Sequence, residues 1–230
     1  MKLPASLAVL AVASVTAHGV VVVATDSQTN GTTSLNHTYV PSASDLLNGL
    51  APSAMAGTFT QEGAGGVGVL TDGAFPSPIT RPTSGPFQFS AFATAGNGGG
   101  TSLTYTLPQA VNLTSVVVYG GWQDGGRDQQ SYSLLYATFA APTTFIPLTT
   151  VNFNPPDPVG NPQVTRVTIT DNAGNLASNV KALRFDFNTT ENGYSGYAEI
   201  DAIGTVIPEP GSAVMLLGGL GMVGLLRRRR

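Results

Sequence analysis

The 230-residue chain contains no cysteine and few charged residues, and both absences exclude classes of site. Without cysteine there can be no disulfides, no thiolate metal sites and no cysteine nucleophiles. Only 10% of the residues are charged, and four of the ten basic ones form a terminal cluster, Arg227, Arg228, Arg229 and Arg230. The rest of the chain is mildly acidic and offers no basic face for nucleic acid.

Histidine is also scarce, and this weakens a catalytic interpretation. The two histidines are His18 and His37, and His37 lies in a polar stretch without a nucleophile-elbow motif. Asp124 and Asp128 form a candidate carboxylate pair for glycoside hydrolysis, but the two glycines between them make a β-turn the simpler interpretation. We therefore expect a protein that is not an enzyme. A secreted polysaccharide-acting enzyme on a β-sandwich scaffold is the alternative.

Glycine and proline are abundant, with 28 and 16 residues respectively, which favours short strands joined by turns. Before the C-terminal tail, no helical stripe exceeds about ten residues; one helical turn is predicted at residues 45–50. Alternation of apolar and polar residues over 101–107 is typical of a half-buried strand, and the apolar run 116–119 of a buried central one. Further strands are predicted at residues 131–136, 164–170, 182–187 and 198–206. The pattern predicts an all-β sandwich or barrel.

The N-terminus has the features of a secretory signal peptide. Lys2 precedes an apolar stretch at residues 7–13, and small residues follow up to Ala17. An early positive charge, a short apolar core and small residues before the cleavage point are typical of such signals. We predict cleavage after Ala17, with Ala24 as a second acceptable site, and hence an exported protein.

The C-terminus combines three features in order. Pro208, Glu209 and Pro210 are followed by an apolar stretch over 213–226 and then by the arginine cluster. As a helix, the apolar stretch spans roughly 21 Å, and the flanking residues and arginine stems bring it closer to the roughly 30 Å of a hydrocarbon core. Cytoplasmic arginines would leave the body of the protein outside. A plain C-terminal membrane anchor is one interpretation.

Taken together, these features resemble the PEP-CTERM sorting signal of Gram-negative bacteria. The resemblance covers residues 208–230. It implies that exosortase, a membrane protease, recognises Pro208, Glu209 and Pro210 and removes the tail near this motif. The arginine cluster would act as the membrane stop. The resemblance also implies a producer that makes exopolysaccharide, and a mature protein that is released or attached at the cell surface.

The body of the chain, residues 57–206, resembles the galactose-binding-like jelly roll of the discoidin or coagulation-factor C type. Asp72 and Gly73 near its start carry the resemblance, together with a closing strand that contains Glu199 and ends at Gly204. The resemblance implies a structural calcium ion held by Asp72 and Glu199. The other interpretation gives Asp72 a role in its Asp-Gly turn and places Glu199 in solvent on an edge strand.

A carbohydrate site needs an aromatic face with hydrogen-bonding groups at its rim. Trp122, the only tryptophan, lies in a glycine-rich loop with Asp124 and Arg127, so these three are candidate ligand-binding residues. The simpler interpretation, which we favour, is that Trp122 packs in the core beside the strand at 116–119.

The sequence thus divides into a signal peptide (1–17), an N-terminal segment (18–56), a jelly-roll β-sandwich (57–206) and a sorting tail with a transmembrane helix (207–230). The N-terminal segment is either an extra strand with a packed loop or a surface spacer. We predict a non-catalytic surface or extracellular-matrix protein, anchored in the membrane as a precursor. Its function would be adhesion or carbohydrate binding, with exopolysaccharide as a candidate partner. A purely structural coat protein is a further alternative.

Overall fold

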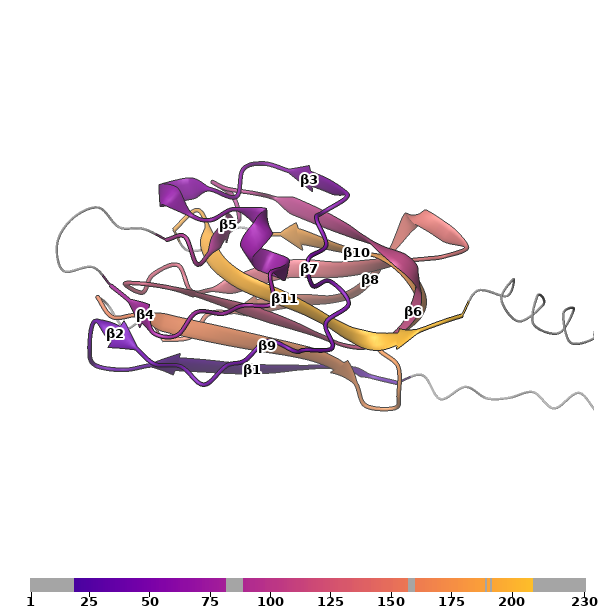
Figure 1. The fold of residues 1–230 in the computed structure, drawn as a ribbon, viewed down its shortest axis with the longest axis horizontal. Coiled ribbons are helices and arrows are strands. Elements are labelled where there is room, and N and C mark those ends of the chain that lie inside the picture. The colour runs from indigo at the N-terminus through magenta and orange to yellow at the C-terminus, as the bar shows by residue number, and fades with distance from the viewer. Residues whose placement is uncertain (1–18, 82–88, 157–159, 189, 191, 209–230) are drawn as a thin grey trace, which may run out of the picture.

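The computed structural model describes residues 19–81, 89–156, 160–188, 190 and 192–208. Most of their strands form one nine-stranded sheet whose named strands all pair antiparallel, and two short strands form a second sheet. The large sheet curls so that its two parts face each other across a core (Figure 1). This confirms the predicted all-β class, in the form of one curled antiparallel sheet. The predicted signal peptide and C-terminal transmembrane helix lie outside the described residues.

The strands follow one another along the whole described chain. In order they are β1 (Val21–Thr29), β2 (Ser34–Leu35), β3 (Ala54–Ala56), β4 (Ile79–Thr80), β5 (Ala93–Ala95), β6 (Ser102–Trp122), β7 (Gln130–Thr138), β8 (Ala141–Phe153), β9 (Gln163–Asp171), β10 (Ala177–Phe187) and β11 (Ser195–Val206). Two 3₁₀ helices, η1 (Gln61–Gly63) and η2 (Val67–Thr71), precede β4. The main path of the sheet is β1-β9-β6-β10-β7-β8, and β11 pairs with β5 and β6.

The strands predicted at 131–136, 164–170, 182–187 and 198–206 are confirmed as β7, β9, β10 and β11. The sequence predicts two strands where the structure has the single 21-residue strand β6. Its first part pairs with β10 and its second part with β9 and β11, so β6 passes from one part of the curled sheet to the other. Pro108 lacks an N–H group, and the register with β10 shifts nearby, which makes the sequence look interrupted.

Two other elements differ from the prediction. The sequence pattern misses β8 because Pro142 and Pro147 interrupt it, but an edge strand tolerates proline. The helical turn predicted at 45–50 is wrong, since this stretch forms bends and turns instead. Among the described residues, no helix is long and apolar enough to cross a membrane.

Two hydrophobic cores lie on opposite sides of the β11-β6-β9 part of the sheet. The first fills the space between the two parts of the curled sheet and includes Tyr105 and Ile200. The second lies on the other face and includes Tyr119 and Trp122, together with Tyr39 from the N-terminal segment. Burial on both faces explains the continuous apolar run at 116–119. Residues 19–56 therefore pack within the fold, with β1 paired along β9.

Candidate metal centre and carbohydrate-binding loop

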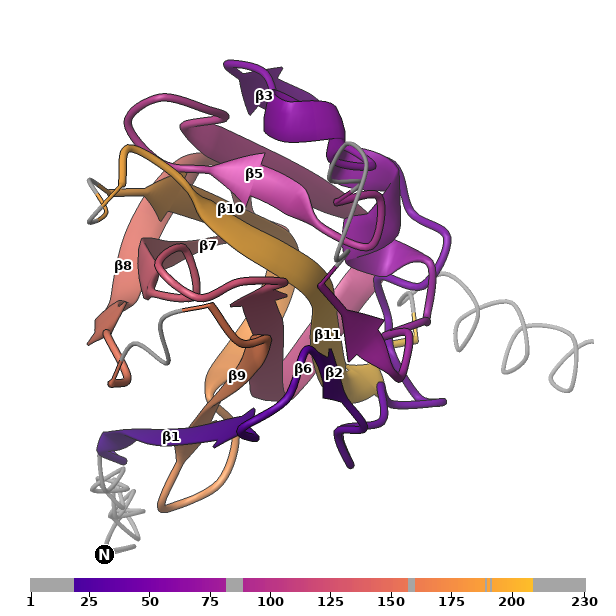
Figure 2. The same cartoon turned by 90° about the vertical axis from the view of Figure 1, so that its left-hand side faces the viewer.

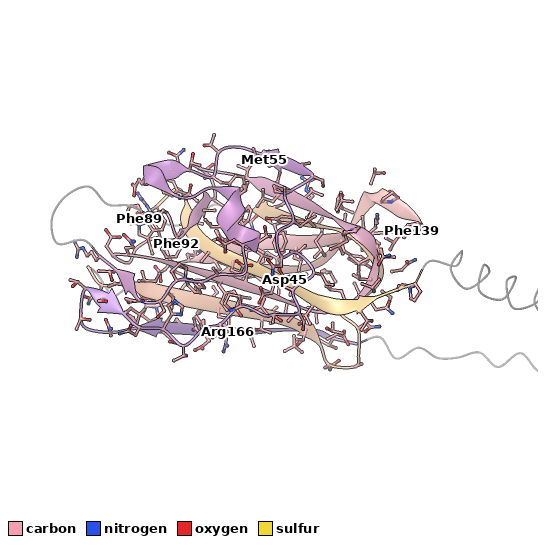
Figure 3. All side chains as sticks on the ribbon, viewed as in Figure 1. Asp45, Met55, Phe89, Phe92, Phe139 and Arg166 are labelled. Carbon is pink, nitrogen blue, oxygen red and sulfur yellow. The ribbon has the colours of Figure 1, made fainter. Side chains whose placement is uncertain are left out.

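Two acidic side chains on β11 point to the same side of the sheet. Glu199 pairs opposite Tyr119, and Asp201 opposite Val117, so both face the side of the second core. Both acids have 0% of their surface exposed. One carboxylate oxygen of each, together with one of Asp45, forms a group whose members lie within 4.8 Å of one another. Figure 3 shows Asp45 beside β11.

Backbone groups hold two of these carboxylates in place. The N–H of Ser42 donates to Oδ2 of Asp201 at 2.7 Å, and the N–H of Ala202 donates to Oδ1 of Asp45 at 2.7 Å. In the described part of the protein, no backbone N–H and no basic side chain donates to the second oxygen of each carboxylate or to either oxygen of Glu199. The side chains that interact with Glu199 and Asp201 include Asp72 and Tyr119, respectively. A buried oxygen of this kind costs free energy unless a proton or a cation compensates for it.

Asp72 joins this group from the end of η2. Its Oδ1 accepts a hydrogen bond from the N–H of Ala74 at 2.9 Å, as expected for a side chain that shapes its turn. Its charge also contributes to the raised pKa of Glu199. The structure therefore brings Asp72 and Glu199 together, and the burial of Glu199 is incompatible with a solvated position.

We call Asp45, Asp72, Glu199 and Asp201 the acidic cluster. Burial, together with the charges of its acidic neighbours, raises the pKa of Glu199 to about 9. Burial likewise raises the pKa of Asp201 to about 6. None of the three ion pairs found among the described residues includes a member of the cluster. Once ionised, the cluster carries negative charge that no described basic side chain neutralises in an ion pair.

The chemistry of these donors fits a hard cation. Calcium takes six to eight oxygen ligands, typically from carboxylates and carbonyl groups. Asp45, Glu199 and Asp201 offer three carboxylates whose oxygens lie close together, and Asp72 is a nearby fourth. Sequence reasoning missed Asp45 and Asp201. The alternation of a strand could have identified Asp201, because it lies two residues after Glu199. No local signal identifies Asp45, which reaches the cluster only through the fold.

The loop between β6 and β7 forms a second polar group. Arg127 makes an ion pair with Glu62 of η1. The guanidinium carbon of Arg127 lies 4.2 Å from the ring centroid of Tyr194. Asn192 Nδ2 donates a hydrogen bond to the carbonyl of Gly126 in the same loop. Three segments far apart in the sequence therefore meet around Arg127.

Trp122 lies beneath this loop rather than on it. Its side chain is 1% exposed and stacks on Phe89, with ring centroids 4.1 Å apart. Tyr194, half-buried, contacts it edge-on at 6.4 Å. Asp124 is also half-buried, and burial raises its pKa while nearby arginines lower it. Of the three residues predicted from sequence, Asp124 and Arg127 are partly exposed, whereas Trp122 belongs to the second core.

We call Glu62, Asp124, Arg127 and Tyr194 the loop cluster. Sequence reasoning missed Glu62 and Tyr194. Neither has a local signal, because each reaches Arg127 from a different part of the chain.

Comparison with known proteins finds similar solved structures but no matching curated protein. A mutant lectin binding domain of Lectinolysin, complexed with Lewis b, matches with a TM-score of 0.45 and 10% identity over 72% of this chain and 99% of that one. CBM32-3 from a family 31 glycoside hydrolase of Clostridium perfringens gives a TM-score of 0.41 and 15% identity, over 70% and 94%. An F5/8 type C domain from Bacteroides fragilis gives a TM-score of 0.32 and 18% identity, over 49% of this chain and 65% of that one. At these TM-scores, the similarity transfers no ligand and no binding residue to this chain.

The sorting tail begins where the fold ends. The N–H of Ile207 donates to the carbonyl of Ala110 at 2.8 Å, and Pro208 is the last described residue. Glu209, Pro210 and the arginine cluster lie outside the described residues. A model of the PEP-CTERM protein-sorting motif matches residues 206–230. PEP-CTERM proteins are exported, processed by exosortase and sorted to the cell surface. The chain therefore carries a PEP-CTERM sorting motif at its C-terminus, as the sequence predicts.

Proposed function

We propose that this protein is a non-catalytic surface or extracellular-matrix protein that binds carbohydrate through its loop cluster. A calcium ion in the acidic cluster would hold the fold around that loop. The tail supports sorting by an exosortase-type protease in a Gram-negative bacterium. Because the PEP-CTERM resemblance implies a producer of exopolysaccharide, we propose that polymer as the ligand.

The observation that carries this proposal is the arrangement of groups around Arg127. A guanidinium presents several N–H donors in a fixed plane, and a carboxylate such as Glu62 accepts hydrogen bonds. Sugars present neighbouring hydroxyl groups, which donate and accept in turn. Tyr194 adds an aromatic ring that is partly open to solvent. These groups come from three segments on a rigid sandwich, so their positions are fixed before a ligand arrives.

Calcium would have a structural role and no catalytic one. Glu199 and Asp201 come from β11, whereas Asp45 and Asp72 come from the segments that cover it. An ion shared among them would neutralise buried charge and tie these segments to β11. When bound, the ion supplies only this charge and these coordination bonds. Glu199 and Asp201 are poorly suited to catalysis, because a fully buried carboxylate cannot reach a polysaccharide.

The carboxylate pair considered for hydrolysis is also poorly placed. Asp124 is half-buried, and Asp128 is fully buried. Two carboxylic acids that hydrolyse a glycosidic bond must both contact the substrate from opposite sides. We therefore favour binding over hydrolysis for the loop cluster.

Binding of the producer's purified exopolysaccharide, measured by titration calorimetry, tests this proposal. We expect Arg127→Ala to reduce the affinity at least tenfold, because it removes the central hydrogen-bond donor. Arg184→Ala is the matched control, since Arg184 also forms an ion pair with an acid, Asp186, but lies on β10. Equal binding by wild type and Arg127→Ala, or equal losses in both variants, would contradict a site at the loop cluster.

A further inference from the structure

The strand β1 forms one border of the large sheet and is paired on one side only. It runs antiparallel to β9 from Val21 to Thr29 with an uninterrupted register. In the sheet order, no other described strand follows it. Both views of the fold place β1 at the lower border of the molecule (Figures 1 and 2).

The outer edge of β1 offers free backbone groups. Asn172 donates its N–H to the carbonyl of Val20, so Val20 and every second residue after it turn their backbone groups towards β9. The residues between them, which include Val21, Val23 and Thr25, turn theirs outward. In the described part of the chain, no hydrogen bond uses the outward groups of these three residues. Such an edge is a template for another strand.

The side chains of β1 make this edge unusually apolar. Val20, Val22 and Val23 are all exposed, and residues 20–25 carry no charge. The first charged residue, Asp26, forms an ion pair with Arg166 of β9. Edge strands are normally protected by lysine, proline or a bulge, and β1 has none of these.

The strand at the other end of the sheet order, β8, has such protection. The strand β8 contains Pro142 and Pro147, which cannot donate to a further strand. Its pairing with β7 also shifts register twice. The strand β8 comes close to β1 in the curled sheet without pairing with it, and of these two edges only β1 lacks such protection.

We propose that β1 pairs antiparallel with β1 of a second copy of this chain, so that two sheets join into one. The apolar run of residues 20–24 is centred on Val22. A two-fold axis at Val22 therefore sets the two apolar runs against each other and places no like charges opposite. This inference is independent of carbohydrate binding, and it depends on which signal cleavage site is used. Cleavage after Ala17 keeps β1 whole, whereas cleavage after Ala24 removes residues 21–24 from it.

A strand pair of this length buries less surface than the roughly 1,200 Å² of a stable, specific interface. The proposed contact therefore predicts a monomer–dimer equilibrium that depends on concentration. High local concentration at a cell surface would favour the dimer.

Sedimentation velocity of the exported protein, recovered from the producing cells over a range of concentrations, tests the inference. We expect wild type to self-associate and Val22→Lys to weaken the association at least tenfold, because two lysines would then oppose each other. Ile146→Lys on β8 is the matched control, since Ile146 and Val22 are 43% and 42% exposed. A monomer at all concentrations, or dissociation caused only by Ile146→Lys, would overturn the inference.

Cross-linking supplies a second readout that does not depend on dimer stability. Because the chain lacks cysteine, Val22→Cys introduces a unique thiol. Opposed non-hydrogen-bonded residues of antiparallel strands have Cα atoms about 4.5 Å apart, which a disulfide can bridge. We expect mild oxidation to give a covalent dimer from Val22→Cys and none from Ile146→Cys. The reverse pattern would place the contact on β8 and refute pairing through β1.

Discussion

The acidic cluster and the loop cluster both gather carboxylates from distant segments, but they differ in burial and in countercharge. In the acidic cluster, Glu199 and Asp201 are fully buried, and no basic side chain in the described part of the chain pairs with them. In the loop cluster, Glu62 pairs with Arg127, and their side chains remain 40% and 23% exposed. The first arrangement is costly without a cation, whereas the second is neutralised and open to a ligand.

The comparison shows how one residue type can serve structure at one place and recognition at another. A buried carboxylate of the acidic cluster, Glu199 or Asp201, influences the free energy of unfolding because water does not solvate its charge. A carboxylate in the loop cluster has little effect on that free energy, but it is available to hydrogen-bond a sugar. Substitutions in the two clusters should therefore separate stability from binding.

The largest expected effect comes from the residue that supports the loop cluster. We expect Trp122→Ala to reduce the free energy of unfolding by about 3–5 kcal/mol, because it leaves a cavity in the second core. Urea unfolding measures this change. Trp122→Phe should reduce the free energy of unfolding much less and should keep carbohydrate binding, since it preserves aromatic packing on Phe89. A small loss in Trp122→Ala would mean that the loop does not rest on this core.

Without metal, the free energy of unfolding should depend on pH through the acidic cluster. Folding raises the pKa of Asp201 to about 6 and of Glu199 to about 9, so the folded protein holds protons that the unfolded chain has released. Stability in a chelator should therefore fall as pH rises, through Asp201 between about pH 4 and 6 and through Glu199 between about pH 4.5 and 9. Urea unfolding at pH 5 and pH 8 measures the fall.

Calcium should cancel this dependence, because the ion stabilises the ionised carboxylates. A chelated protein with equal stability at pH 5 and pH 8 would contradict the assignment of the cluster as uncompensated. Stability that rises with pH in chelator would contradict that assignment even more directly.

The smallest effect on stability is expected at the loop cluster. Arg127→Ala breaks a partly exposed ion pair and should change the free energy of unfolding by only about 0–1 kcal/mol, less at high salt. Chemical unfolding at low and high salt checks this value. A loss of several kcal/mol would show that Arg127 holds the fold, and would remove the distinction between the two clusters.

Much of the sheet follows from local sequence pattern, because each strand carries its own alternation of side chains. The strands β7, β9, β10 and β11 are of this kind. The continuity of β6 across Pro108 and the existence of β8 do not follow, since both depend on pairing partners rather than on local residues. Tertiary context decides where proline is tolerated.

The candidate sites show the same limit. Asp72 and Glu199 could be proposed from a resemblance, and Asp201 could have been added from its spacing. Asp45, Glu62 and Tyr194 could not, because only the fold brings them to their partners. For Trp122, the neighbouring strand at 116–119 favours the core over the loop, and its side chain is 1% exposed.

Thermal unfolding with and without calcium, in wild type and in Glu199→Gln, tests the central claim most directly. Calcium at about 100 times its dissociation constant stabilises a protein by about 2.7 kcal/mol, or roughly 5–10 °C for a domain of this size. We predict this rise in wild type at pH 8 and none in Glu199→Gln. In chelator, Glu199→Gln should unfold at a higher temperature than wild type, because Glu199 must take up a proton on folding at pH 8 whereas glutamine is already neutral. A variant that is less stable than wild type in chelator, or that responds equally to calcium, would contradict the account.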